Sequence, residues 1–189
     1  MQELEQKVLI SPQEFARCRE TLQRHTRTAG DRYVQVNYYF DTPDFSLSAA
    51  RCMLRVRRKK NTLYLQFKTK RIRKDSLFLC DEWEAELPEF PKTVNPSRYF
   101  PDAPDVECSF LGDLVTDRTD FVFPGGVVSL DENIYLGKTD YEVEIEGEPD
   151  AIERIAAFLN PTGSADQGNG KFSRFLHRYQ AYASGGEGE

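Results

Sequence analysis

The sequence predicts an α+β fold, in which an antiparallel sheet has one apolar and one charged face and helices pack against the apolar side. Two observations support this prediction. Several segments alternate apolar and charged residues, and because successive side chains of a strand point to opposite faces, each such strand has two different faces. Other segments place apolar residues at the three-to-four-residue spacing of an amphipathic helix.

Strands are expected where the sequence alternates or is rich in β-branched and aromatic residues. These segments are residues 3–10, 33–40, 52–58, 63–70, 80–87, 119–123, 127–131 and 141–146. A helix is expected to begin after Ser11 and to end near Thr26, because Ser11 can cap it, Pro12 suits its first position and Glu14 completes a capping box. The other expected helices are residues 45–50, 106–115, 150–159 and 172–179.

Composition predicts a soluble cytoplasmic protein with one domain over residues 1–183 and a disordered tail over 184–189. No apolar run approaches the length that spans a bilayer, so no membrane partner is expected, and the acidic N-terminus is unlike a signal peptide. With a net charge of −6 over 189 residues, the chain is not expected to bind nucleic acid by bulk attraction. A homodimer is left open.

Metal chemistry based on sulfur or imidazole is not indicated. The chain has two histidines and four widely spaced cysteines, namely Cys18, Cys52, Cys80 and Cys108. No Cys-x-x-Cys pair occurs, so neither a zinc site nor a disulfide framework is suggested. Any metal is therefore expected to be a hard cation bound by oxygen.

The first expected strand places Glu3, Glu5 and Lys7 on one face. Two carboxylates at this spacing can share a hard divalent cation, and the neighbouring lysine can meet the anion that the cation brings. For this stretch taken alone, a solvated strand face with a chance pattern of charges is the alternative.

The later charged strands differ in sign. A basic hairpin is expected from residues 52–58 and 63–70, with Arg55 and Arg57 on one face of its first strand and Lys68 on its second. The acidic strands each carry three glutamates on one face: Glu82, Glu84 and Glu86 in one, and Glu142, Glu144 and Glu146 in the other.

Such strands allow two architectures. An open sheet would turn its charged face to water, with helices on the other side. A closed barrel would turn the charges inward, where they could not stay dry, because each unpaired buried ion is costly. A multiply charged anion together with a divalent cation would satisfy both sets of charges.

Several motifs, in the order in which they occur, resemble those of the CYTH superfamily, the triphosphate tunnel metalloenzymes. They are Glu3-x-Glu5-x-Lys7, Asn37-Tyr38-Tyr39-Phe40-Asp41-Thr42-Pro43, Leu54-Arg55-Val56-Arg57, Lys68, the two acidic strands, Asp131 and Gly170-Lys171-Phe172-Ser173-Arg174-Phe175. The first motif is weak alone, but the ordered set covers nearly the whole chain and favours the functional interpretation. The likeness is to small bacterial single-domain members.

The resemblance implies a closed antiparallel barrel of about eight strands with helices packed on the outside. Its tunnel would bind triphosphates and hydrolyse them with Mg²⁺ or Mn²⁺. The implied metal ligands are Glu3, Glu5, Glu142 and Glu144, and the implied phosphate-binding residues are Lys7, Arg55, Arg57, Lys68 and Lys171. The catalytic candidates are Glu84, Asp131 and Lys68. Asp81 stands where relatives often have a basic residue, and Glu146 leaves the choice of glutamate ligands ambiguous.

The function so predicted is metal-dependent hydrolysis of inorganic triphosphate or of an organic or nucleoside triphosphate. An adenylate cyclase of the same fold and a non-catalytic sensor of polyphosphate or nucleotides are the alternatives. The carboxylates favour catalysis, because a pure anion sensor gains nothing from them. In every case the expected partner is a small-molecule triphosphate or polyphosphate.

Overall fold

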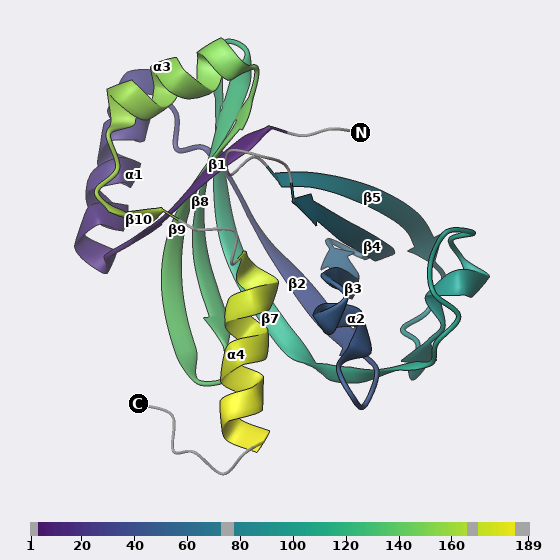
Figure 1. The fold of residues 1–189 in the computed structure, drawn as a ribbon. Coiled ribbons are helices and arrows are strands. Elements are labelled where there is room, and N and C mark those ends of the chain that lie inside the picture. Colours follow the sequence, from purple (N-terminus) through teal and green to yellow (C-terminus); the bar gives the residue numbers. More distant parts are fainter. Residues whose placement is uncertain (1–3, 73–77, 166–169, 184–189) are drawn as a thin grey trace. The chain divides into compact units, whose positions relative to one another are not determined.

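The computed structural model describes residues 4–72, 78–165 and 170–183 (Figure 1). Its strands are β1 (Glu5–Ile10), β2 (Asp31–Asp41), β3 (Cys52–Lys59), β4 (Thr62–Ile72), β5 (Phe78–Leu87), β6 (Thr93–Val94), β7 (Cys108–Phe123), β8 (Gly126–Tyr135), β9 (Lys138–Gly147) and β10 (Gly163–Ala165). Its helices are α1 (Pro12–Thr26), α2 (Ser46–Ala49), α3 (Pro149–Leu159), α4 (Lys171–Ala183) and the short 3₁₀ helix η2 (Pro96–Arg98). The α+β class is confirmed, and the tail expected at 184–189 lies outside the described residues.

The ten strands form one sheet in the order β10-β1-β9-β8-β7-β2-β3-β4-β5, with β6 paired to β7. The prediction of a closed eight-stranded barrel is wrong, because this sheet has ten strands and its two ends, β10 and β5, are not paired over the described residues. A strand has only two edges. β1 uses one for β9 and gives the other to β10 at Val8–Ile10, so over that stretch it has no edge left for closure.

The helix expected over 106–115 is also wrong, since residues 108–115 belong to β7 and the two residues before them are not helical. Val106, Phe110 and Leu114 recur every four residues, which imitates a helix. Backbone pairing decides otherwise: β6 aligns with the start of β7, where Val94 lies opposite Cys108.

The chain divides into two compact units. Among the described residues, unit 1 comprises 35–114 and 170–183, and unit 2 comprises 4–34 and 115–165. Strands β2 and β7 each contribute residues to both units.

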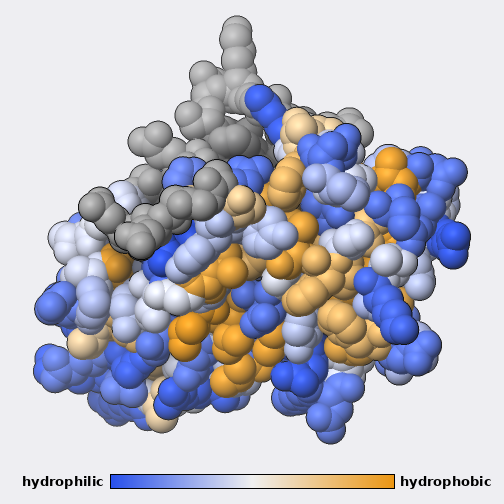
Figure 2. All heavy atoms as spheres, turned by 90° about the horizontal axis from the view of Figure 1, so that it is seen from below, coloured by the Kyte–Doolittle hydropathy of each residue, from blue (hydrophilic) through white to orange (hydrophobic). Residues whose placement is uncertain are grey.

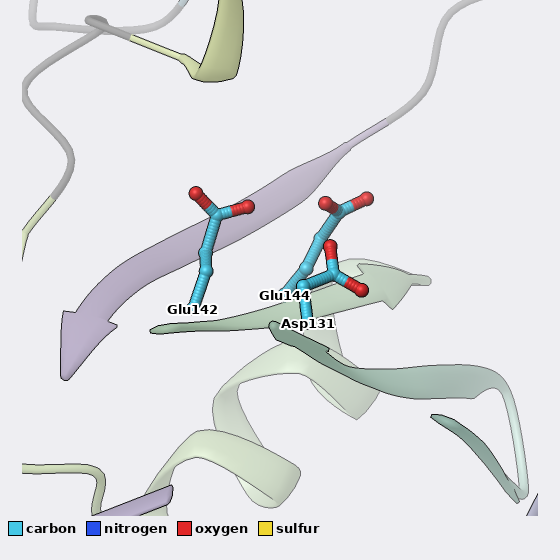
Figure 3. A group of neighbouring side chains, drawn as sticks. All are labelled: Asp131, Glu142 and Glu144. Carbon is cyan, nitrogen blue, oxygen red and sulfur yellow. The ribbon is translucent and has the colours of Figure 1, made fainter. Parts of the chain in front are cut away.

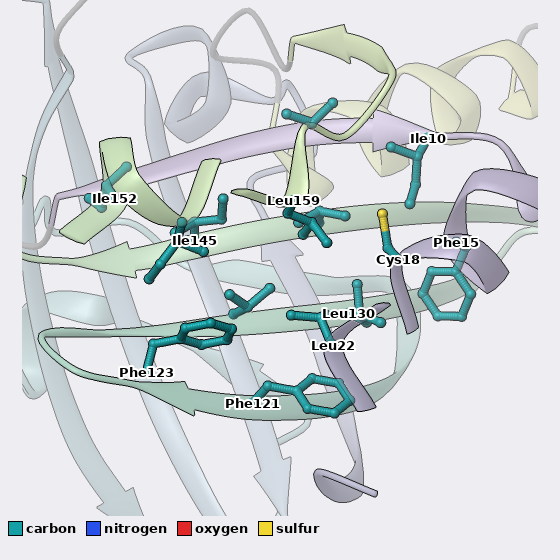
Figure 4. Close-up of a cluster of buried hydrophobic side chains, with 14 of the residues drawn as sticks. Ile10, Phe15, Cys18, Leu22, Phe121, Phe123, Leu130, Ile145, Ile152 and Leu159 are labelled. Carbon is teal, nitrogen blue, oxygen red and sulfur yellow. The ribbon is translucent and has the colours of Figure 1, made fainter. Parts of the chain in front are cut away.

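The core of unit 2 lies between its strands and two helices. In Figure 1, α1 and α3 lie on the same side of β1, β8 and β9, and Figure 4 shows the side chains between them. This core includes Val8, Ile10, Phe15, Leu22, Val128, Leu130, Val143, Ile145, Ile152 and Ile155. Because fully burying one such side chain contributes about 1.5–3 kcal/mol, the core fixes which alternate residues of each strand point away from the helices.

Helix α1 begins as the sequence predicts, with one difference. The Ser11 hydroxyl accepts the Glu14 N–H at 3.1 Å, which is the expected cap. The Glu14 carboxylate does not close the capping box. It accepts hydrogen bonds from Arg17 and from the Thr162 N–H at 2.8 Å, and the Arg17 bond lowers the pKa of Glu14 to about 2.

Unit 1 has its own core on the apolar face of β2, β3 and β4. Its members are Phe40, Leu47, Leu54, Val56, Leu65, Phe67, Leu87, Val94, Phe100, Ala103 and Cys108. Helix α4 packs on the other side of β2. Its Phe172 and Phe175 contact the ring of Tyr39, and the neighbours of Tyr39 along β2 point to this core, so Tyr39 itself points away from it. The polar side of β2 therefore carries a helix.

Some large apolar side chains remain at the surface. Phe90, Tyr99 and Phe110 are each exposed by more than two fifths. On the face that Figure 2 presents, hydrophobic residues gather in a broad central area bordered by hydrophilic ones. Within the described ranges, the helices are too short or too polar to cross a membrane.

Candidate functional site

Three carboxylates meet on the polar face of unit 2. Asp131 of β8 lies opposite Glu142 of β9, and Glu144 follows two residues along β9. Because directly opposed residues of antiparallel strands share a face, the alternation of the two strands produces this group. All three side chains are buried, and one oxygen of each lies within 4.8 Å of the others. Figure 3 shows them rising from the strands on the same side.

Two cations accompany the acidic group. Arg118 of β7 donates from Nε and Nη2 to the two carboxylate oxygens of Asp131, both at 2.7 Å, and from Nη2 to Glu144 Oε2 at 3.1 Å. Lys7 Nζ lies 2.7 Å from Glu5 Oε1 and 3.7 Å from Glu144 Oε2. Burial alone would lower the pKa of Arg118, but the charges of Glu144 and Asp131 outweigh it and raise the pKa. Arg118 therefore stays charged.

Arg118 is a residue that the sequence analysis missed, because the strand was expected to begin only at Thr119. A signal was present in the hairpin expected around Pro124-Gly125-Gly126. Pairing Phe123 with Gly126 and counting back along both strands places Arg118 opposite Asp131, which is the observed register. Extending the hairpin by one more residue on its first strand would have found it.

A row of directly opposed polar residues crosses four strands of unit 1. Tyr39, Arg55, Gln66 and Glu84 lie opposite one another in turn on β2, β3, β4 and β5. Arg55 Nε donates to Gln66 Oε1 at 2.7 Å, and Gln66 Nε2 donates to Glu84 Oε2 at 2.5 Å. Glu84 therefore does not bond the buried Arg55 in these contacts, but orients the Gln66 amide that accepts from Arg55.

Two further basic residues of unit 1 have partners in neighbouring strands. Arg57 Nε donates to Asn37 Oδ1 at 3.0 Å. Lys68 Nζ lies 2.5 Å from Glu82 Oε2 in β5. The acidic strand β5 thus neutralises part of the basic hairpin, as opposite charges facing each other across strands do.

The structure distributes the expected site residues between the units. In unit 2 it brings together Glu5, Lys7, Asp131, Glu142 and Glu144. In unit 1 it links Arg55 to Glu84 through Gln66, pairs Arg57 with Asn37 and Lys68 with Glu82, and places Lys171 where its charge acts on Tyr39. The expected ligand Glu3 lies outside the described residues.

Comparison with known proteins identifies the family. The model of the CYTH domain matches residues 1–159. The chain belongs to the CYTH family. A curated relative from Bacillus subtilis, named "Putative triphosphatase YjbK", is 29% identical over 150 aligned positions, and the match covers 76% of each protein.

Two solved structures share the fold of this CYTH chain. A structure from Bacillus halodurans, described as a "putative adenylate cyclase", has a TM-score of 0.69 at 24% identity. The match covers 92% of this chain and 97% of the Bacillus halodurans chain. A protein from Hippeastrum, described as a "putative adenylyl cyclase" with a dominant triphosphatase activity, has a TM-score of 0.61 at 22% identity and covers 98% of this chain and 97% of its own length.

Proposed function

We propose that this CYTH protein is a metal-dependent hydrolase of triphosphate substrates. Family membership and the name of the Bacillus subtilis relative support a triphosphatase. The observation that carries the proposal is the buried group of Asp131, Glu142 and Glu144. Burying three carboxylates so close together is costly unless cations neutralise them, and in unit 2 Arg118 and Lys7 lie close enough to do so in part.

The donor set of this group fits Mg²⁺ or Mn²⁺. All three side chains offer carboxylate oxygens, and hard divalent cations prefer oxygen ligands. In the proposal Asp131, Glu142 and Glu144 hold the cation, whereas Glu5 is engaged by Lys7 at 2.7 Å. When bound, the cation would supply charge neutralisation for phosphate oxygens.

The basic residues of unit 1 take the phosphate role in the proposal. Arg55 and Arg57 present fixed guanidinium groups, each oriented by a side-chain amide oxygen, from Gln66 or Asn37. Guanidinium matches phosphate oxygens in geometry as well as in charge. Phosphoryl transfer requires mainly charge neutralisation and positioning, so the chain needs no covalent nucleophile for this reaction.

Product analysis tests the proposal against its alternatives. Purified protein is incubated with inorganic triphosphate, ATP and thiamine triphosphate in the presence of Mg²⁺ or Mn²⁺, and the products are separated by anion-exchange chromatography. We expect orthophosphate and the corresponding diphosphate species. Cyclic AMP and pyrophosphate from ATP would instead identify a cyclase, and binding without turnover of any substrate would identify a sensor.

A further inference from the structure

Two buried polar atoms on the polar face of unit 1 have no hydrogen-bond partner among the described residues: the Tyr39 hydroxyl oxygen and Asn37 Nδ2. Both side chains are 0% exposed. Buried polar groups are nearly always paired, because an unmade hydrogen bond leaves the cost of desolvation uncompensated. Two such atoms, two residues apart on one strand, therefore indicate an absent partner.

The surroundings indicate the chemistry of that partner. Tyr39 lies opposite Arg55 and Asn37 lies opposite Arg57 in the β2–β3 register. Burial raises the pKa of the Tyr39 hydroxyl, while the charges of Arg55, Lys171 and Arg57 act in the opposite direction. The hydroxyl therefore keeps its proton, and its charged neighbours are cations that offer only donors. The missing partner must be an acceptor, and the positive charge favours an anion.

The Asn37 side chain is also oriented to donate hydrogen bonds to an acceptor. Its Oδ1 accepts from Arg57 Nε at 3.0 Å, which fixes the amide so that Nδ2, with its two N–H groups, points elsewhere. A tetrahedral phosphoryl group carries several acceptor oxygens, so it can accept bonds from neutral donors and from guanidinium groups at once.

We propose that the Tyr39 hydroxyl and the Asn37 amide donate hydrogen bonds to a phosphoryl group that Arg55 and Arg57 bind. This inference deepens the proposed function and rests on it, since the bound group is a phosphate of the triphosphate substrate. The two neutral donors add directional bonds without adding charge, which favours a phosphoryl group over a simple anion such as chloride.

Tyr39 has a second role that must be separated from the first. Its ring packs on Phe172 and Phe175 of α4, with centroids 4.8 and 4.9 Å apart. A Cβ added to Gly112 would lie 3.0 Å from the Phe175 ring, so Gly112 leaves the space that this ring fills. The ring of Tyr39 thus positions α4, whereas only the hydroxyl is available for a ligand. Tyr39→Phe removes the hydroxyl and keeps the ring.

Calorimetric titration with tripolyphosphate, in Ca²⁺ to prevent turnover, tests the inference. We expect Tyr39→Phe to raise the dissociation constant by about tenfold, as for one lost bond to a charged group, with an unchanged melting temperature. Tyr38→Phe is the matched control, because this neighbour points to the opposite face, where its ring packs on Phe90; we expect less than about a twofold change. Asn37→Asp keeps the acceptor for Arg57 but replaces the donor by a negative charge, so binding should weaken by more than about tenfold.

The outcomes separate this inference from the function on which it rests. If Arg57→Ala weakens binding while Tyr39→Phe and Asn37→Asp bind as the wild type does, the two donors do not contact phosphate and the inference is overturned. The same holds if Tyr39→Phe lowers the melting temperature without affecting affinity, which would indicate a structural partner such as a buried water. If the wild type does not bind tripolyphosphate, the proposed function itself fails.

Discussion

Replacing Asp131 by asparagine is expected to lower the free energy of unfolding by about 2 kcal/mol, because Arg118 loses its two-oxygen partner and keeps only the single bond to Glu144. The Asp131 side chain is fully buried and that of Arg118 is 15% exposed. Both carboxylate oxygens accept from Arg118, and an arginine does not release its proton in proteins, so Arg118 stays charged after the substitution.

The matched control for this substitution is Asp117→Asn, on the same strand as Arg118. Asp117 pairs with Arg32, whose side chain is 66% exposed, and exposed pairs contribute about 0–1 kcal/mol. Urea denaturation in EDTA measures both variants without any contribution from bound metal. Equal losses in the two variants would show that the Arg118–Asp131 pair is as well solvated as a surface pair.

Arg57→Ala is expected to raise the dissociation constant of tripolyphosphate by about tenfold or more, whereas Arg58→Ala should change it by less than about threefold. Arg57 lies on the polar face, where it bonds Asn37. Arg58 follows directly, points to the other face opposite Leu63, and is exposed. A contact with a charged group contributes about 1.5–3 kcal/mol, compared with at most about 1 kcal/mol for an exposed pair.

Calorimetry with each arginine variant compares these neighbours directly. The contrast tests the alternation of β3, since the two residues have the same chemistry and differ mainly in the face on which they lie. Equal effects on tripolyphosphate affinity would remove the phosphate role from the polar face of unit 1.

Local pattern predicted most of the elements. The strands of unit 2 were predictable because Val143 and Ile145 alternate with Glu142 and Glu144, and burying the apolar pair excludes a shift of the strand by one residue. Helix α1 was predictable because its cap is encoded next to its first residue, at Ser11.

The two wrong predictions, the closed barrel and the helix over 106–115, have a common physical cause. Whether the sheet closes depends on which strands meet at its ends, and the short strand β10, which occupies an edge of β1, has no distinctive pattern in its three residues. The strand character of residues 108–115 likewise depends on pairing with distant segments, namely β2 and the two-residue β6. Pairing between distant segments is not encoded in a local period.

The candidate site was predictable in part. Alternation alone placed Glu142 and Glu144 on one face, whereas Asp131 came from the family resemblance and Arg118 was missed. The buried state of the acidic group follows from the register between β8 and β9, which brings Asp131 and Glu142 together. The unpaired Tyr39 hydroxyl is a property of packing, so no sequence pattern indicated it.

The release of phosphate from inorganic triphosphate by metal-stripped protein tests the central claim most directly. We expect background rates in EDTA and recovery when Mg²⁺ or Mn²⁺ is added in excess. Glu142→Gln should remain at least about 100-fold slower at the same metal concentration. Losing an outer-shell partner of a metal costs about 10–100-fold, and Glu142 is a proposed direct ligand, so its loss should cost at least as much. Glu132→Gln, next to Asp131 but on the other face, should match the wild type. Undiminished turnover in excess chelator, or equal rates for the two variants, would contradict the account.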